Sequence, residues 1–171
     1  MSGAGRGEPA WGAARYLAVD IGDRRTGLAV GDARSRLAIP IGVLEVPLAQ
    51  RDGEELVEAV AAAARAHLGD PPRGALVVGL PVNMDGTEGT RARAMRGLAA
   101  RLGARTGLEV HLQDERLTSA AADWSMARSG LTRGQKKARR DALAAAAILG
   151  DFLARLGQEN APSGPEAGDG C

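Results

Sequence analysis

Residues 75–79 constrain the fold of this chain more than any other segment, because they are apolar throughout and lie between turn signals. A short apolar run of this kind is typical of a strand that is buried on both faces. Such a strand belongs inside a sheet that helices cover. The segment therefore favours an α/β fold over an all-α bundle or a sheet with one face in solvent.

The rest of the chain supplies the neighbours that such a strand needs. Three strands come first, and the first two form a hairpin around the turn at residues 22–25. Because proline cannot donate a ladder hydrogen bond, Pro40 predicts that the third strand either lies at an edge of the sheet or starts late. Strands and helices then alternate. We predict strands at 16–21, 26–30, 39–46, 75–79 and 109–113, and helices from Asp52 to before Gly69, at 90–105, at 118–128 and at 140–156.

The length of 171 residues and a hydrophobic content of 44% fit one globular domain with a substantial core. We expect a flexible segment at 1–14, the domain at 15–156 and a disordered tail at 157–171. No apolar run has the length of a membrane helix, and the N-terminal residues do not form a secretion signal. The single cysteine, Cys171, excludes an internal disulfide. These features predict a cytoplasmic protein without membrane contact.

Three carboxylates stand beside segments that are otherwise apolar. Asp20 ends the run 16–19, Glu115 follows the strand-like run 110–113, and Asp141 opens the apolar stretch 142–149. A carboxylate in such a place is costly unless something compensates its charge. If the fold brought all three together, they would form a site for a divalent cation.

Each acid also has a purely structural interpretation. Asp20 could accept hydrogen bonds from the amides of the 22–24 turn, and Glu115 could form a surface ion pair with Arg116. Asp141 could stabilise the positive end of the helix that we predict to begin at residue 140.

The basic residues are unevenly distributed, although the net charge is only +1. Residues 128–140 hold six basic side chains and no acid, and this stretch runs directly into Asp141. It could bind phosphate or be a solvated surface. For the five arginines of residues 90–108, a solvated helix face is the better interpretation. Aromatic residues make up only 2% of the chain, so bound nucleic acid would be held by its backbone rather than by stacked bases.

Four motifs give the chain a family resemblance. They are LAVDIGDRRTGLAVGD at 17–32, VVGLPVNMDGTEG at 77–89, DERLTS at 114–119 and KKxxxDALAAAAIL at 136–149. In this order they resemble the YqgF-type family of pre-16S rRNA nucleases and Holliday junction resolvases. Two residues depart from the family pattern: Asp23 follows the DIG triplet, and Ser119 replaces a threonine.

The resemblance implies a ribonuclease H-like fold with a five-stranded mixed sheet in the order 3-2-1-4-5. It also implies that Asp20, Glu115 and Asp141 are catalytic residues that bind Mg²⁺ or Mn²⁺, with Asp85 or Glu88 as a reserve ligand. The loop at 81–89 would lie close to a sugar-phosphate backbone. Arg116 would be either a phosphate clamp or an anchor for Glu115. The expected nucleic-acid contacts are Asn83, Arg116, Thr118, Lys136, Lys137 and Arg139.

The function expected from the resemblance is a metal-dependent endonuclease for structured nucleic acid, acting in 5′-end maturation of the 16S rRNA precursor. A resolvase of branched DNA and a non-catalytic nucleic-acid-binding module are the alternatives. The segment DIGxxxTG also resembles a phosphate loop of sugar kinases and actin-like ATPases, but those enzymes need two such domains. The protein would act as a monomer or a homodimer.

Overall fold

The computed structural model describes residues 15–117 and 132–159. Their strands and helices follow the predicted alternation, with two short 3₁₀ segments added. The strands are β1 (Arg15–Ile21), β2 (Thr26–Asp32), β3 (Ala38–Leu44), β4 (Ala75–Leu80) and β5 (Glu109–Asp114); the helices are η1 (Gln50–Gly53), α1 (Glu54–Leu68), α2 (Thr90–Thr106), η2 (Glu115–Leu117) and α4 (Arg133–Glu159).

The five strands form one mixed sheet in the order β3-β2-β1-β4-β5. β1, β2 and β3 are antiparallel, whereas β4 and β5 run parallel to β1. This arrangement confirms the predicted ribonuclease H-like order. β3 lies at an edge, which is one of the two alternatives that Pro40 predicts, and β5 forms the other edge.

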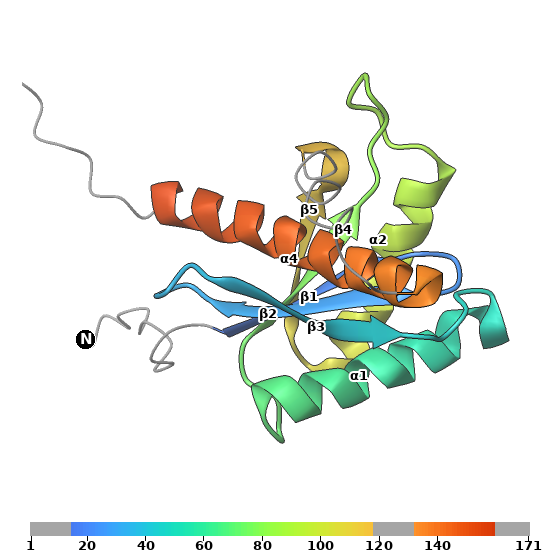
Figure 1. The fold of residues 1–171 in the computed structure, drawn as a ribbon, viewed down its shortest axis with the longest axis horizontal. Helices are drawn as coiled ribbons and strands as arrows, with labels where there is room; N and C mark the ends of the chain where they lie inside the picture. The colour runs from blue at the N-terminus through green and yellow to red at the C-terminus, as the bar shows by residue number, and fades with distance from the viewer. Residues whose placement is uncertain (1–14, 118–131, 160–171) are drawn as a thin grey trace, which may run out of the picture.

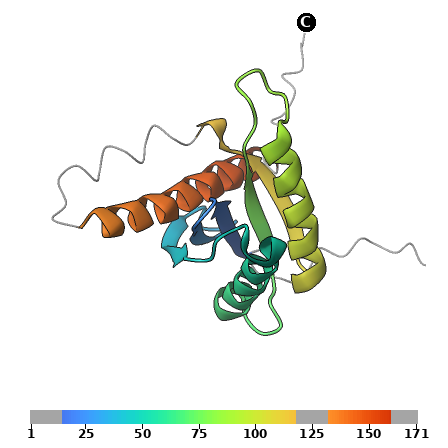
Figure 2. The ribbon, with the colours of Figure 1, turned by 90° about the vertical axis from the view of Figure 1, so that its right-hand side faces the viewer.

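Helices cover both faces of the sheet. α1 and α2 pack on one face, and α4 crosses the other (Figures 1 and 2). β4 is buried at every position, which confirms the interpretation of its apolar run. Two hydrophobic cores result, one on each side. Of the described helices, none combines the length and the apolar character needed to cross a membrane.

The start of α1 differs from the prediction. Asp52 does not cap the helix: it lies within η1 with φ 56°, and the helix begins at Glu54. The N-cap residue is Gly53, and no side chain bonds the first amides. The turn through Arg51 and Asp52, both in the left-handed region, delays the helix beyond the residue that the sequence favours.

The last helix differs more. α4 begins at Arg133, so the expected basic loop is helical, and Asp141 lies about two turns inside the helix rather than in its first turn. The helix-dipole explanation of Asp141 is therefore wrong. The apolar stretch 142–149 is not buried on all sides, because the buried residues of α4 lie along one side; they are Ala142, Ala145, Ile148, Leu149, Phe152 and Leu153. The helix predicted at 118–128, with its cap Thr118, lies outside the described residues.

Candidate active site

The parallel strands bring two of the three acids to the same edge of the sheet. β1 and β5 flank β4, so their carboxyl ends lie together. Asp20 comes near the end of β1, and Glu115 follows β5 directly. Tyr16 and Ala18 pack on the α4 side of the sheet. Because strand residues alternate between faces, Asp20 points to that side as well.

Two glycines leave space around Asp20. Gly27 of β2 is the cross-strand partner of Asp20, and a Cβ atom there would overlap the main chain of Asp141 in α4. Gly79 of β4 would, with a Cβ atom, overlap the side-chain oxygen Oε1 of Glu115. The absence of side chains at these two positions therefore lets α4 and Glu115 approach Asp20 from opposite sides.

Asp20 and Glu115 share a hydrogen bond between their side chains. Burial raises the pKa of Asp20, and the charge of Asp141 raises it further. Burial also raises the pKa of Glu115 to about 7, and the charge of Asp20 adds to this effect. The hydrogen bond lowers the pKa of Asp20 but raises that of Glu115, so Glu115 donates the shared proton and Asp20 accepts it.

Asp141 lies beside this pair but has a cationic neighbour of its own. Its Oδ2 is 3.4 Å from Nε of Arg25, which belongs to the β1–β2 turn. The two side chains border a cavity of about 290 Å³, which Arg24 and Lys137 also line, together with Gly22 and Asp23. Lys137, a predicted nucleic-acid contact, thus lies on the same cavity as Asp141.

Arg91 is a site residue that the sequence analysis missed. Its Nη2 donates a 3.0 Å hydrogen bond to the carbonyl of Ile21, and its Nη1 bonds to Asp23 at 2.6 Å. The positive charge of Arg91 lowers the pKa of both Asp20 and Glu115. The sequence did offer a signal, because Arg91 lies in the first turn of a helix that begins at the same sheet edge. We had instead counted Arg91 among the five arginines of residues 90–108, which we interpreted as a solvated helix face.

Arg116 anchors the end of β5 to the loop that follows β4. Its guanidinium forms an ion pair with Asp114, with Nη2–Oδ2 at 2.6 Å. It also donates to the carbonyls of Asn83 and Met84 at 3.4 and 3.5 Å. These contacts tie the end of β5 to the β4–α2 loop. The role of Arg116 as a phosphate clamp or as an anchor for Glu115, and its contact with nucleic acid, stay predictions.

The remaining predicted residues have mixed surroundings. Asn83 and Asp85 form hydrogen bonds to Thr87 within their own loop, and Glu88 forms an ion pair with Arg96. Arg139 is exposed on α4, and Lys136 is half-buried. The nucleic-acid contacts of Asn83, Lys136 and Arg139, and the reserve metal role of Asp85 or Glu88, stay predictions.

The chemistry of the cluster fits a hard divalent cation. Among residues 15–117 and 132–159, no three His, Cys, Asp or Glu side chains are already arranged around a metal position. However, Asp20, Glu115 and Asp141 offer only oxygen donors, which Mg²⁺ and Mn²⁺ prefer. Burial first, and then the charge of Asp20, raise the pKa of Glu115, and a bound cation would favour the ionised form against both effects.

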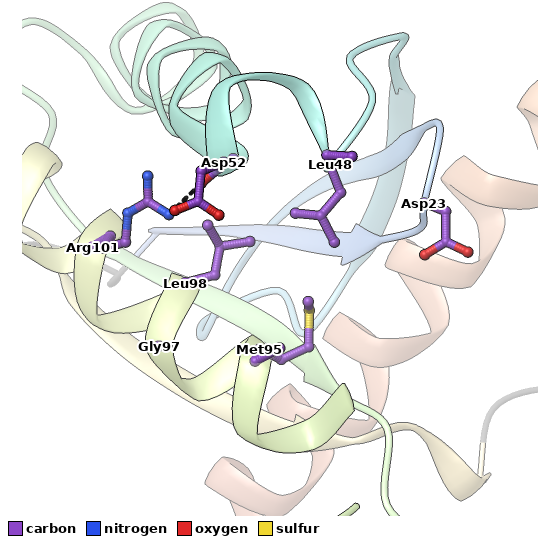
Figure 3. A pocket seen from close by; sticks show the side chains of 10 residues that line it. Asp23, Leu48, Asp52, Met95, Gly97, Leu98 and Arg101 are labelled. Carbon is purple, nitrogen blue, oxygen red and sulfur yellow. Dashed lines mark hydrogen bonds between the residues drawn. The ribbon is translucent and has the colours of Figure 1, made fainter. Parts of the chain in front are cut away.

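A larger cavity lies elsewhere on the described part of the chain. About 560 Å³ in volume, it lies between η1 and α2, on the opposite face of the sheet from α4 (Figure 3). Its floor is apolar, with the side chains of Leu48, Met95 and Leu98 gathered in it, and Arg101 closes one end by bonding to the carbonyl of Asp52. The two cavities share only Asp23, and Asp141 lines the smaller one. The larger volume therefore does not mark the position of the candidate metal ligands.

Comparison with known proteins adds independent evidence. The model of a family described as "RuvX: Holliday junction resolvase" matches residues 14–155. A protein of Anaeromyxobacter sp. (strain K) named "Putative pre-16S rRNA nuclease" is 43% identical over 141 residues, which is 82% of this chain and 97% of that protein. A protein of the same name from Rhodospirillum centenum is 37% identical, over 88% of this chain and 78% of its own length.

Among solved structures, the chain is similar to Thermus thermophilus RuvC in complex with a Holliday junction substrate. The TM-score is 0.47 and the identity 17%, and the similarity covers 84% of this chain and 96% of RuvC.

Proposed function

The chain belongs to the RuvX family of Holliday junction resolvases, and from that membership we propose that it is a metal-dependent endonuclease for structured nucleic acid. Because its relatives are named as pre-16S rRNA nucleases, we place its activity in the cytoplasm, at 5′-end maturation of the 16S rRNA precursor. The hydrogen-bonded pair of Asp20 and Glu115, with Asp141 beside it, is the observation that carries this proposal.

Hydrolysis of a phosphodiester requires an activated water, relief of phosphate charge and a stabilised leaving oxygen. Mg²⁺ or Mn²⁺, held by Asp20, Glu115 and Asp141, would supply all three when bound. The protein's own residues prepare this site. Glu115 must give up its shared proton to become a ligand, and Arg91 favours that loss because its charge lowers the pKa of Glu115.

The basic groups around Asp141 would receive the phosphate backbone. Arg25 and Lys137 line the cavity beside Asp141, so a phosphate there would lie next to the carboxylates. Arg25 would exchange its partner Asp141 for the phosphate when a cation takes that carboxylate. Within residues 15–117 and 132–159, Tyr16 and Phe152 are both buried, so neither ring is available for base stacking.

Branched DNA is the second candidate substrate, because the family description names Holliday junction resolvases. The same carboxylates would serve either substrate, since they act on the phosphodiester and not on the base. The two functions differ only in which nucleic acid the surrounding surface accepts.

One side-by-side assay tests the proposal. The purified full chain, with Mg²⁺ or Mn²⁺, is offered a 16S precursor fragment and a four-way DNA junction. We expect metal-dependent cleavage of the precursor. Cleavage of the junction alone would favour the resolvase, and binding of either without cleavage would favour a non-catalytic module.

Asp20→Asn should abolish cleavage without unfolding the protein, because it removes charge but little volume. Above pH 7, where Glu115 has lost its proton, it should also raise the melting temperature in metal-free buffer, since one of the repelling carboxylates is gone. Asp70→Asn is the matched control: Asp70 is exposed and lies before β4, away from the carboxyl edge of the sheet. Undiminished turnover by Asp20→Asn would contradict the metal-binding role.

A further inference from the structure

The loop between β4 and α2 contains a turn at residues 83–87 that satisfies its own hydrogen bonds. The amide of Asn83 donates to the carbonyl of Thr87 at 2.9 Å, and the amide of Gly86 donates to that of Asn83 at 2.8 Å. Asp85 accepts from both the amide and the hydroxyl of Thr87. Gly86 has φ +86°, which closes the turn. The turn is thus a preformed structure whose polar side chains are already paired.

Met84 stands at the tip of this turn with 92% of its surface exposed. That is the largest exposed fraction among the big apolar side chains of the described residues, ahead of Leu37 at 62%. None of the turn's hydrogen bonds uses the Met84 side chain, so the turn itself does not require an apolar residue there. A single exposed apolar side chain is common on protein surfaces, so exposure alone does not single out Met84. What singles it out is that a hydrogen-bonded turn holds this flexible side chain at a fixed position.

The tip is fixed relative to the carboxylates. Arg116 donates to the carbonyls of Asn83 and Met84, and it belongs to the same short 3₁₀ segment as Glu115. Its ion pair with Asp114 holds the guanidinium in place. Both ribbon views show the β4–α2 segment projecting beyond the end of the sheet (Figures 1 and 2). The turn that carries Met84 is thus tied to the segment that carries Glu115.

We propose that Met84 is a wedge that enters the base stack of bound nucleic acid and opens it beside the carboxylate pair. This inference rests on the proposed function. Asp20 and Glu115 are recessed against the sheet, and a regular duplex cannot bend its backbone into them without loss of stacking. An inserted apolar side chain replaces the lost stacking contact and holds the kink, a use that methionine serves in other nucleic-acid-binding proteins. The wedge thus makes Met84 a residue that selects deformable or already unpaired sites.

Short RNA duplexes that carry 2-aminopurine at successive positions test the wedge, since this base fluoresces more strongly when unstacked. Binding is followed in the full chain with Asp20→Asn, so that the RNA stays intact. We expect fluorescence to rise at one or two adjacent positions. Adding Met84→Ser should remove the rise, while adding Met84→Leu should keep it. The Kd should change less than about threefold, because phosphate contacts supply most of the affinity.

Cleavage gives a second readout in the chain with Asp20 intact. Met84→Ser should slow cleavage of a fully paired site by about tenfold or more, because unstacking costs a few kcal/mol. A substrate already unpaired at that site should be cut at nearly the parent rate. Leu37→Ser is the matched control, since Leu37 is also apolar and exposed. Unchanged thermal melting of each variant shows that the fold is kept.

The outcomes separate the two proposals. A parent protein that cleaves RNA without any fluorescence rise, or a Met84→Ser variant that keeps both the rise and the rate, would overturn the wedge alone and leave a protein partner as the use of Met84. RNA that is bound and unstacked but never cleaved would overturn the nuclease and support the wedge. Failure to bind any of the duplexes would overturn both.

Discussion

At the scale of single residues, Glu115 has a raised pKa that makes the stability of the protein depend on pH. In the folded protein Glu115 keeps its proton to about pH 7, whereas its ordinary pKa is 4.5. Between these values the folded state therefore binds more protons than the unfolded chain. Stability from this group is complete below about pH 4.5 and is lost as the pH rises towards 7.

We expect the metal-free protein to have a melting temperature that falls between pH 5 and pH 7.5, with part of the fall due to Glu115. Glu115→Gln cannot ionise, so it should flatten that part of the curve. Glu45→Gln, an exposed control, should leave the curve unchanged. Calorimetry of the three proteins over this range is the measurement, and parallel curves for all three would contradict the shared proton.

A saturating divalent cation should reverse the trend above pH 7. The cation binds the ionised carboxylates, and whatever binds only the folded state stabilises it. The same metal should have little effect on Glu115→Gln, because the amide is a poorer ligand than the carboxylate it replaces.

At the scale of elements, the contact between β2 and α4 depends on Gly27. Alanine at this position would place a methyl group where main-chain atoms of Asp141 lie. Main-chain atoms cannot avoid such an overlap by a change of rotamer. We expect Gly27→Ala to lower the free energy of unfolding by about 1–3 kcal/mol or more and to impair cleavage, since Asp141 must move.

Urea denaturation measures this effect against a matched control, Gly150→Ala. Gly150 lies within α4, and a Cβ atom there meets nothing within 4 Å. That substitution should stabilise the protein by about 0.5–1 kcal/mol, since alanine favours a helix interior. Equal stabilities for the two variants would show that the close approach at Gly27 is unimportant.

The first turns of α4 carry the basic residues for which we predict contact with the phosphate backbone of nucleic acid. Neutralising Lys136, Lys137 and Arg139 together should weaken binding of all sequences similarly. It should also flatten the log–log dependence of affinity on salt by about two to three units, because each lost phosphate contact removes roughly 0.7–0.9. Titrations at several salt concentrations measure the slope.

A helical arrangement refines this expectation, because the three side chains cannot all point the same way. Lys137 lines the cavity with Asp141, so it should contribute more to cleavage than its neighbour Lys136. If the triple variant kept the same dependence of affinity on salt, the nucleic-acid backbone would run along the 83–87 turn instead.

At the scale of the whole molecule, the sheet was predictable and the last helix was not. The apolar run of β4 and the alternation around it were enough to predict the elements of a mixed sheet, because local pattern and burial agree there. The strand order itself came from the family resemblance. The same strand order explains why Asp20 and Glu115 could be expected at one edge. In contrast, the start of α4 was predicted too late. Its first turns are polar and show no apolar periodicity, and the buried residues that hold the helix on the sheet begin only at Ala142.

The parts of the site that the sequence analysis missed depend on contacts between distant segments. Arg91 acts on Asp20 through a position set by the packing of α2, and its place in the first turn of that helix was the only signal in the sequence. The structural importance of Gly27 and Gly79 appears only when α4 and Glu115 are in place. Site residues near strand ends can thus be inferred from the sequence. The groups that shift their pKa values or leave space for them cannot.

The position of Asp141 in α4 also has a consequence for how the protein is made. α4 is the last of the described elements to leave the ribosome, and it covers an entire apolar face of the sheet. Until it docks, a nascent chain has Asp20 and Glu115 but lacks their third partner, so it cannot assemble the complete cluster. The proposed role of Asp141 as third ligand thus predicts an enzyme that is inert while still attached to the ribosome and gains its activity only when its final helix docks.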